Sequence, residues 1–159
     1  MTNKTFVYPC SLGFFYVTVK DGRIIGLDIS SHCNMIKCAI SDPKLVDQDI
    51  YNAMQPIIDN NDFEAYLKSG YQVAQVGTPF ANKVWEQISK INFGETKTYQ
   101  EIADAIGSPK AVRAVGSACG KNKLAIFVPC HRVVGTGRNK FSYRWGSDLK
   151  QILLERESK

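Results

Sequence analysis

Signals that start and stop helices follow one another closely through the second half of the chain. Thr78-Pro79 places a proline at the first helical position after an N-cap residue, and the four residues from Thr98 to Glu101 form a capping box. The apolar patterns of helical period end at glycines, namely Gly94, Gly107 and Gly120. These signals leave room only for short helices joined by tight turns. The second half is therefore predicted to be mostly helical.

Two of these predicted helices are arranged as in a helix-turn-helix. Ser108-Pro109 comes directly after Gly107, so the next helix is predicted to begin at once and to run to about Cys119. Two short helices joined by a tight turn describe a helix-turn-helix, although an ordinary helical hairpin has the same pattern. The second helix has no Asn or Gln and a single arginine, Arg113. Such a helix suits a close, non-specific approach to the DNA backbone.

The first half is predicted to be a small sheet with helices. Residues 5–8, 14–20 and 23–29 are rich in β-branched and aromatic side chains, and Asp21-Gly22 between the last two is a hairpin signal. A helical pattern follows, with Ile50, Met54, Ile57 and Ile58 on one face. A short helix is expected at residues 63–68, and a linker at residues 71–77.

These patterns predict an α+β protein of two domains. Residues 1–76 form a small N-terminal sheet-and-helix domain with a supporting role. Residues 77–159 form a mostly helical C-terminal domain that contains the helix-turn-helix. A chain of 159 residues is long enough for two small domains with cores of their own.

The net charge of +5 is unevenly distributed along the chain. Residues 1–75 carry six Lys/Arg and eight Asp/Glu, whereas residues 76–159 carry fourteen and seven. The segment between Ala105 and Ser147 has no acidic residue, and its basic residues are Lys110, Arg113, Lys121, Lys123, Arg132, Arg138, Lys140 and Arg144. A field of one sign attracts polyanions such as nucleic acid, although a basic face that contacts only solvent is also common.

A cysteine and a histidine are adjacent in the segment Pro129-Cys130-His131-Arg132. A thiol becomes a nucleophile as its thiolate, which a neighbouring base or positive charge favours. A cysteine is also often a small, inert core residue, and a lone Cys-His pair is more often of that kind. Near the end of the chain, Glu157 would complete a set of nucleophile, base and orienting carboxylate if it reached the imidazole, although a terminal glutamate is more commonly exposed.

Composition excludes several classes of protein. No apolar run approaches the roughly 18 residues of a membrane span, and the N-terminus lacks the pattern of a signal peptide. Five cysteines without the spacing of a disulfide scaffold favour a reducing compartment. A cytoplasmic location is therefore expected, with association to the nucleoid if the source is a prokaryote. If the source is a eukaryote, the expected location is the nucleus. The spacing of Cys10, His32, Cys33 and Cys38 fits no structural zinc signature, so no metal site is predicted.

Taken together, the blocks of the second half resemble the O6-alkylguanine-DNA alkyltransferases, a family of methylated-DNA–protein-cysteine methyltransferases. The matching blocks are Gly77-Thr78-Pro79-Phe80, Val84-Trp85, Gly94-Glu95-Thr96, Thr98-Tyr99, Pro109-Lys110-Ala111-Val112-Arg113-Ala114-Val115-Gly116, Asn122, Pro129-Cys130-His131-Arg132-Val133 and Tyr143-Arg144-Trp145-Gly146. The resemblance runs from Gly77 to the C-terminus and is faint in the first half.

The resemblance implies a chemical role for several matching residues. Cys130 is expected to accept the alkyl group, with His131 acting on it through a water and Glu157 behind the imidazole. Tyr99 is expected to donate a hydrogen bond to the purine as the guanine leaves. Lys150 matches a lysine near the site in the family.

The resemblance also implies how DNA is held. Arg113 is expected to fill the gap that the flipped nucleotide leaves, and Asn122 to act as a hinge between the active-site turn and the recognition helix. Other contacts to DNA are expected at Lys110, Ala111, Ala114 and Ser117. The guanine pocket is expected to be lined by Val133, Tyr143, Arg144 and Trp145.

The resemblance implies direct-reversal repair: an irreversible, single-turnover transfer of a methyl or larger alkyl group from guanine O6, and from thymine O4, to the cysteine after base flipping. The expected partner is duplex DNA that contains O6-alkylguanine, with no cofactor, no membrane and a monomeric protein. The sequence departs from the pattern of the family at three places. Many relatives have proline at the positions of Lys123 and Ala125, and others have small residues in place of Arg144-Trp145. A relative that binds alkylated bases without repair, a helix-turn-helix regulator with an inert thiol, and a thiol protease are the alternatives.

Overall fold

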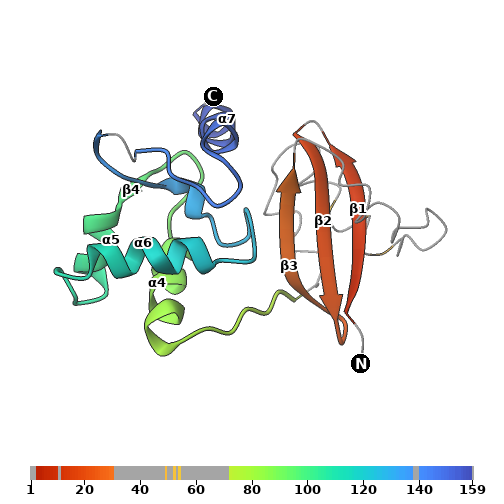
Figure 1. Cartoon of the computed structure of the whole chain (residues 1–159), viewed down its shortest axis with the longest axis horizontal. Helices are drawn as coiled ribbons and strands as arrows, with labels where there is room; N and C mark the ends of the chain where they lie inside the picture. Colours follow the sequence, from red (N-terminus) through yellow and green to blue (C-terminus); the bar gives the residue numbers. More distant parts are fainter. Residues whose placement is uncertain are drawn as a thin grey trace. The chain divides into compact units, whose positions relative to one another are not determined.

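The computed structural model describes residues 3–10, 12–30, 49, 52, 54, 72–137 and 140–158. The chain divides into two compact units, Met1–Gln75 and Val76–Lys159. This boundary falls one residue before the predicted one. The N-terminal unit contains a sheet and the C-terminal unit is mostly helical, so the chain has the predicted α+β class (Figure 1).

The N-terminal sheet has three antiparallel strands in the order β1-β2-β3 (Figure 1). They are β1 (Lys4–Cys10), β2 (Gly13–Lys20) and β3 (Arg23–Ser30). Between β2 and β3, Asp21 and Gly22 have φ angles of 50° and 75°. Positive φ at both central residues is the requirement of a type I′ turn, whose twist matches that of the flanking strands. The predicted hairpin is confirmed.

The middle strand is covered on both faces. Phe15, Tyr16 and Val17 are consecutive in β2 and all are buried. Successive side chains of a strand point to opposite faces, so neither face of β2 is open to solvent here. Burying a side chain such as Phe15 contributes about 1.5–3 kcal/mol.

Three residues that were predicted to be part of a linker pair with the edge strand of the N-terminal sheet. The Ile24 amide donates to the Gln72 carbonyl at 3.0 Å, and the Ala74 amide donates to the Ile24 carbonyl at 2.9 Å. Val73 therefore forms a parallel bridge with Ile24 in β3. The linker prediction is wrong for these residues because they satisfy backbone groups at the edge of the sheet.

The predicted helix around Met54 is described at three positions only. Asp49, Asn52 and Met54 are helical, and Met54 is fully buried. The rest of that helix and the predicted helix at 63–68 lie outside the described residues. The same holds for His32, Cys33, Cys38 and the side chain of Cys10.

Two helices of the C-terminal unit begin where their caps predict. In α4 (Pro79–Ser89) the Thr78 hydroxyl accepts a hydrogen bond from the Ala81 amide at 3.1 Å. In α5 (Tyr99–Ala105) Thr98 and Glu101 make both bonds of the capping box. Gly77 allows the chain to enter α4, because a Cβ there would lie 2.6 Å from the indole of Trp85.

The third helix begins later than predicted. The structure places α6 at Val112–Lys121, and its N-cap residue Ala111 makes no side-chain capping bond. Ser108 and Pro109 belong to a turn that the Ala111 amide closes on the Ser108 carbonyl at 2.9 Å. Ser at the first position and Pro at the second are also favoured in a β-turn, which explains why the helix-start reading was wrong.

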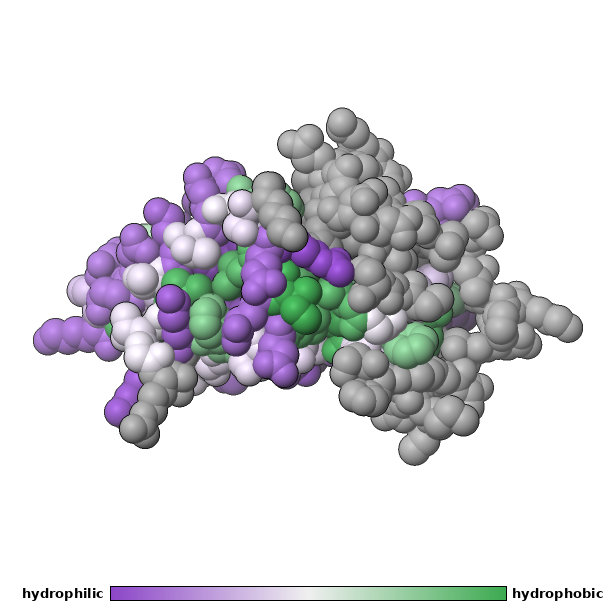
Figure 2. Space-filling view, turned by 90° about the horizontal axis from the view of Figure 1, so that it is seen from above, coloured by the Kyte–Doolittle hydropathy of each residue, from purple (hydrophilic) through white to green (hydrophobic). Residues whose placement is uncertain are grey.

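These three helices pack around a common core. Buried apolar side chains from all three contribute to it: Val84, Trp85 and Ile88 from α4, Ile102 from α5, and Val115 and Ala118 from α6. The Trp85 indole N–H donates to the Ala118 carbonyl at 2.9 Å and joins α4 to α6. The space-filling view shows mainly hydrophilic side chains on the visible face of this unit, with apolar ones gathered between them (Figure 2).

The last helix, α7 (Ser147–Glu157), buries an unexpected face. The apolar pattern predicted that Leu149, Ile152 and Leu153 share the inner face. Only Leu153 of these is buried, and Ile152 is 42% exposed. Lys150 and Glu157 are buried instead. No helix in the described ranges is both long and apolar enough to cross a membrane.

Candidate active site

Cys130 lies at the end of a tightly folded loop. It begins the short 3-10 helix η2 (Cys130–Arg132) and is 6% exposed. Just before it, Pro129 has φ −78° and ψ 63°, and the Cys130 amide donates to the Val128 carbonyl at 2.7 Å. This is an inverse γ-turn, for which proline's restricted φ is well suited. The preceding proline therefore fixes the direction from which the thiol approaches the site.

The same loop carries local backbone strain. Ile126 has a φ of 69°, and around it the Phe127 amide donates to the Ala125 carbonyl at 2.7 Å. A β-branched residue at positive φ is an outlier that costs about 1–3 kcal/mol and persists only where the surroundings impose it. Leu124, Ala125 and Ile126 are all buried, and this packing holds the strained turn in place.

Asn122 fastens this loop to helix α6. Its side chain is fully buried at the C-cap of α6. The amide nitrogen Nδ2 lies 2.9 Å from the Val128 carbonyl and 3.3 Å from Cys130 Sγ, and the Oδ1 atom accepts from the Leu124 amide at 3.0 Å. The predicted hinge residue thus lies at the helix end and contacts the Cys130 thiol.

Glu157 holds two neighbouring side chains of η2. Its carboxylate accepts from His131 Nε2 at 2.8 Å and from Arg132 Nε and Nη2 at 2.9 and 2.8 Å. Arg132 Nη1 also donates to the Ile91 carbonyl at 2.9 Å. Burial alone would raise the pKa of Glu157, but the hydrogen bonds from His131 and Arg132 outweigh it and lower that pKa. Glu157 is therefore an ionised acceptor.

This carboxylate determines which nitrogen of the imidazole carries the proton. Burial lowers the pKa of His131, so the ring is neutral at neutral pH. A neutral imidazole has one N–H, and an ionised carboxylate can only accept. The proton must then lie on Nε2, which leaves Nδ1 with a lone pair. Nδ1 is buried and has no hydrogen-bond partner among the described residues, so it can accept a proton.

Lys150 brings a positive charge to the pocket. Its ammonium is fully buried and donates to the carbonyls of Val133 and Ser142, the latter at 3.0 Å. Burial lowers the pKa of Lys150 to about 8. The group is thus still largely charged at neutral pH, and its charge favours thiolates at Cys119 and Cys130.

The described residues whose buried side chain is charged, an imidazole or an amide are gathered in this one centre. They are Asn122, His131, Arg132, Lys150 and Glu157. Burying charge costs free energy unless the charge is paired and hydrogen-bonded, and such concentrations of buried titratable groups are typical of functional sites. The described residues include no group of three or more His, Cys, Asp or Glu that could hold a metal ion.

Cys130 is a thiol at rest. Its pKa is raised well above the ordinary value, first by its hydrogen-bonding interaction with Cys119 and then by burial. Neither cysteine takes part in a disulfide. A thiol with a raised pKa needs a base or a nearby positive charge to become a nucleophile, and the Lys150 charge acts in that direction.

A short parallel ladder brings Tyr99 to the same pocket. Strand β4 (Lys97–Thr98) pairs with β5 (Val133–Val134), which directly follows η2. Tyr99 comes next after β4, and its ring lies 5.9 Å from the Lys150 ammonium. Burial, followed by the nearby thiols, raises the pKa of Tyr99 to about 12, so its hydroxyl remains a hydrogen-bond donor.

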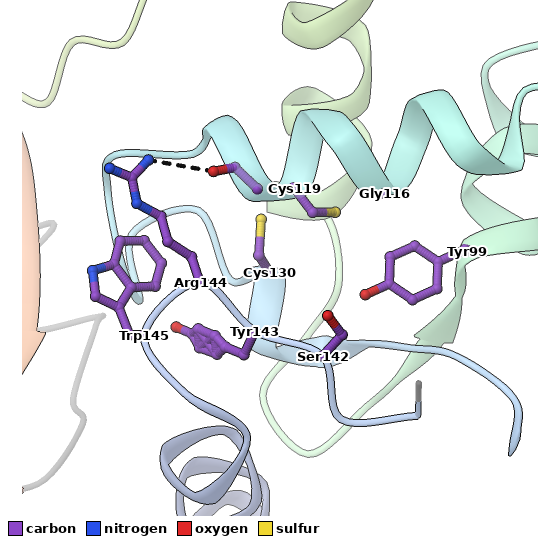
Figure 3. Close-up of a pocket in the computed structure, with 9 residues that line it drawn as sticks. Tyr99, Gly116, Cys119, Cys130, Ser142, Tyr143, Arg144 and Trp145 are labelled. Carbon is purple, nitrogen blue, oxygen red and sulfur yellow. Dashed lines mark hydrogen bonds between the residues drawn. The ribbon is translucent and has the colours of Figure 1, made fainter. Parts of the chain in front are cut away.

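Tyr99 and Cys130 are among the residues that line a cavity of about 60 Å³ beside helix α6. Figure 3 shows Cys130 and Cys119 facing it from one side and Tyr99, Ser142 and Tyr143 from the others. Tyr143 meets Trp145 edge to face, with ring centroids 5.2 Å apart. Of the predicted pocket residues, Tyr143, Arg144 and Trp145 line the cavity, and the Val133 carbonyl binds Lys150 beside it.

Arg144 joins the wall of this pocket to the end of α6. Its Nη1 atom donates to the carbonyls of Asn122 at 3.1 Å and Gly120 at 3.4 Å. The last carbonyls of a helix lack partners within it, so this is a capping interaction. Its guanidinium also lies 5.5 Å from the centre of the Trp145 ring.

Replacing Arg144 by alanine should lower the free energy of unfolding by about 1 kcal/mol, the size of one or two partly exposed hydrogen bonds. Urea unfolding followed by tryptophan fluorescence measures this. Lys140→Ala is the matched control, because Lys140 is an exposed cation of the same loop whose ammonium lies over the ring of Phe141. Equal stabilities of the two variants would contradict the capping role.

The predicted DNA-binding residues lie on and before α6. Lys110, Arg113, Ala114 and Ser117 are exposed, and Ala111 is half-buried. Lys121, Lys123, Lys140 and Arg144 of the acid-free segment are exposed as well. One member of the basic set does not belong to this surface: Arg132 is buried and paired with Glu157. Arg138 lies outside the described residues.

Two residues in or next to this centre, Arg132 and Cys119, were given no role when the sequence was considered alone. Arg132 was counted among the surface cations, and no local signal indicates its bond to a carboxylate 25 residues away. Cys119 was taken only as the approximate end of a helix. The sequence offered one signal that could have placed Cys119 at the site: it follows Gly116 by three residues on a helix of small side chains.

Comparison with known proteins identifies what this arrangement is similar to. Residues 79–159 match the model of the family described as 6-O-methylguanine DNA methyltransferase, DNA binding domain. Over 83 residues the chain is 60% identical to a probable methylated-DNA–protein-cysteine methyltransferase of Acanthamoeba polyphaga mimivirus, a match that covers 52% of this chain and 55% of the relative. The chain thus spans little more than half the length of this curated relative.

Solved structures match over almost the whole chain. The crystal structure of Mycobacterium tuberculosis O6-methylguanine methyltransferase is similar with a TM-score of 0.75 and 28% identity, covering 99% of this chain and 93% of that one. A structure of the M. tuberculosis protein OGT in complex with DNA is similar with a TM-score of 0.72 and 30% identity, covering 98% and 92%.

Proposed function

This chain belongs, through residues 79–159, to the 6-O-methylguanine DNA methyltransferase family, and on that premise we propose that it repairs O6-alkylguanine in duplex DNA by moving the alkyl group to Cys130. The observation that carries the proposal is the buried pair in which Glu157 orients His131, the residue next to Cys130 in the chain, while Cys130 itself lines a pocket next to an exposed basic helix. Methyl and larger alkyl groups on guanine O6, and those on thymine O4, are the proposed substrates.

The transfer is a displacement at carbon. The Cys130 proton passes through a water to His131 Nδ1, and the sulfur attacks the alkyl carbon as its bond to O6 breaks. Lys150 and the Asn122 amide stabilise the thiolate as it forms. The Tyr99 hydroxyl donates to the purine as negative charge develops on it. The resulting thioether is stable, so each molecule acts once.

The base must leave the double helix before this can occur. An alkyl group on O6 cannot reach a buried thiol from within the stack, and flipping costs a few kcal/mol. In the proposal, α5 and α6 act as a helix-turn-helix, and α6 approaches the DNA with its small side chains. The likeness to an M. tuberculosis protein solved in complex with DNA supports DNA as the partner.

Intact-mass spectrometry tests the proposal directly. The protein is incubated with a duplex oligonucleotide that contains one O6-methylguanine, and a control sample receives the unmodified duplex. The expected result is a mass increase in which one methyl group replaces one hydrogen, located on the Cys130 peptide. No increase would favour a relative that only binds the base, or a regulator with an inert thiol.

Replacing Arg113 by alanine should slow repair in duplex DNA on the order of tenfold or more, while reaction with the free base O6-benzylguanine changes little. Arg113 is exposed on α6. In the proposal it fills the gap that the flipped nucleotide leaves, which lowers the free energy needed to unstack the base, and a free base needs no unstacking. The two second-order rate constants are compared in each variant. Arg113→Lys is the control for charge, and equal losses on both substrates would exclude the finger role.

Binding to DNA should weaken steeply with salt and depend little on sequence. Lys110 and Lys121 are exposed in the acid-free segment, and replacing either by alanine should reduce the slope of log affinity against log salt by about 1. Fluorescence anisotropy at several salt concentrations measures the slope. Lys83→Ala, an exposed lysine of α4, should leave it unchanged, and an equal effect of all three variants would contradict the assignment.

A further inference from the structure

The pocket contains a second thiol that the proposed transfer does not use. Cys119 lies in the last turn of α6 and is less buried than Cys130. Both cysteines line the same cavity of about 60 Å³, and Figure 3 shows their two sulfur atoms between α6 and the turn that carries Cys130. Both are free thiols, and each shifts the pKa of the other.

The two thiols differ in acidity. The pKa of Cys119 is lowered, first by its hydrogen-bonding interaction with Cys130, and the Lys150 charge acts in the same direction. The pKa of Cys130 is raised by the same interaction and by burial. Because the thiolate is the form that reacts with oxidants, Cys119 is the more reactive of the two toward a small oxidant that enters the cavity.

We propose that Cys119 and Cys130 form a dithiol site that hydroperoxides oxidise to an intramolecular disulfide. In the first step the Cys119 thiolate attacks a peroxide oxygen, which gives a sulfenic acid on Cys119 and releases the other oxygen as water or an alcohol. In the second step the Cys130 sulfur attacks the Cys119 sulfur, a disulfide forms and water leaves. The two thiols lose two electrons and two protons in total, and the peroxide is reduced.

The oxidation does not depend on alkyl transfer, but its consequence rests on the proposed function. In the disulfide the Cys130 sulfur is no longer a thiol and cannot accept an alkyl group. Without a neighbouring thiol, peroxide would oxidise Cys130 to a sulfenic acid and then to a sulfinic acid, and thiols do not reduce a sulfinic acid. A neighbouring Cys119 therefore converts an irreversible loss of the acceptor into a reversible one.

The test uses the full-length reduced protein treated with hydrogen peroxide, followed by blocking of free thiols and peptide mapping without reductant. The expected result is a linked pair of peptides that contain Cys119 and Cys130, a loss of two hydrogens in the intact mass, and loss of methyl transfer that dithiothreitol restores. A link that involves Cys10, Cys33 or Cys38 instead, or no link at all, would overturn the proposal.

Cys119→Ser provides the matched variant, with Cys119→Ala as a second form should the first fold poorly. After peroxide, the fraction of methyl transfer that dithiothreitol recovers should be much lower in these variants than in the wild type. Equal recovery would also overturn the proposal. If the Cys119–Cys130 link forms but Cys130 never accepts a methyl group, the proposed repair function fails and the dithiol site stands.

Discussion

Replacing Cys130 by serine should abolish alkyl transfer and leave binding to duplex DNA unchanged. A serine hydroxyl is far less acidic than a thiol, and the neutral His131 imidazole with its lowered pKa is too weak a base to make an alkoxide from it. DNA contacts are unaffected, because residue 130 is buried while the basic residues of α6 are exposed.

Intact mass after incubation with O6-methylguanine DNA measures the first outcome, and anisotropy of a labelled duplex measures the second. The wild-type protein should carry its methyl group on the Cys130 peptide. A methyl group on Cys119, the other thiol of the pocket, would show that the acceptor is wrongly assigned. Methylation of the serine variant at an undiminished rate would do the same.

Local signals predicted the parts of the fold that local interactions decide. The type I′ turn at Asp21-Gly22 and the capping box of Thr98 and Glu101 each involve backbone groups within a few residues, so a short sequence contains all the information. Ser108-Pro109 failed for a related reason. The same two residues are favoured at a helix start and in a β-turn, and only the path of the following chain separates the two.

The site itself could not be derived from periodicity. A hydrophobic pattern assumes that the inner face of a helix is apolar, but α7 places Lys150 and Glu157 inward and leaves Ile152 exposed. These groups are buried because Val133, His131 and Arg132 bind them, and such partners are distant in sequence. The resemblance to a known family named Cys130, His131 and Glu157. It did not indicate that Arg132 shares the carboxylate.

Replacing Glu157 by glutamine should be strongly destabilising, by about 3–5 kcal/mol, the usual cost of removing one partner of a buried ion pair. The carboxylate accepts three hydrogen bonds from His131 and Arg132. Glutamine has nearly the same shape, but its NH₂ group would face one of these donors, and the Arg132 guanidinium would be left buried without a counter-charge. Chemical denaturation measures the free energy of unfolding.

The variant should also respond differently to acid. In the wild type the pKa of Glu157 is lower in the folded state than its ordinary value of 4.5, so its stabilising contribution is present above about pH 4.5 and is lost as the pH falls through the folded pKa. The pKa of His131 is also lowered from 6.5, so the unfolded chain takes up its proton first, and stability falls as the pH drops below about 6.5. Glu157→Gln removes the first effect, and its stability should therefore decline less steeply below about pH 4.5.

Glu155→Gln is the matched control for both measurements, because Glu155 is an exposed carboxylate on the same helix. It should change the free energy of unfolding by no more than about 0.5 kcal/mol, as surface substitutions usually do. A Glu157→Gln variant as stable as this control would mean that the buried carboxylate does not hold His131 and Arg132. The imidazole would then lack the partner that keeps its proton on Nε2, and the basis for assigning Nδ1 as the proton acceptor for Cys130 would be lost.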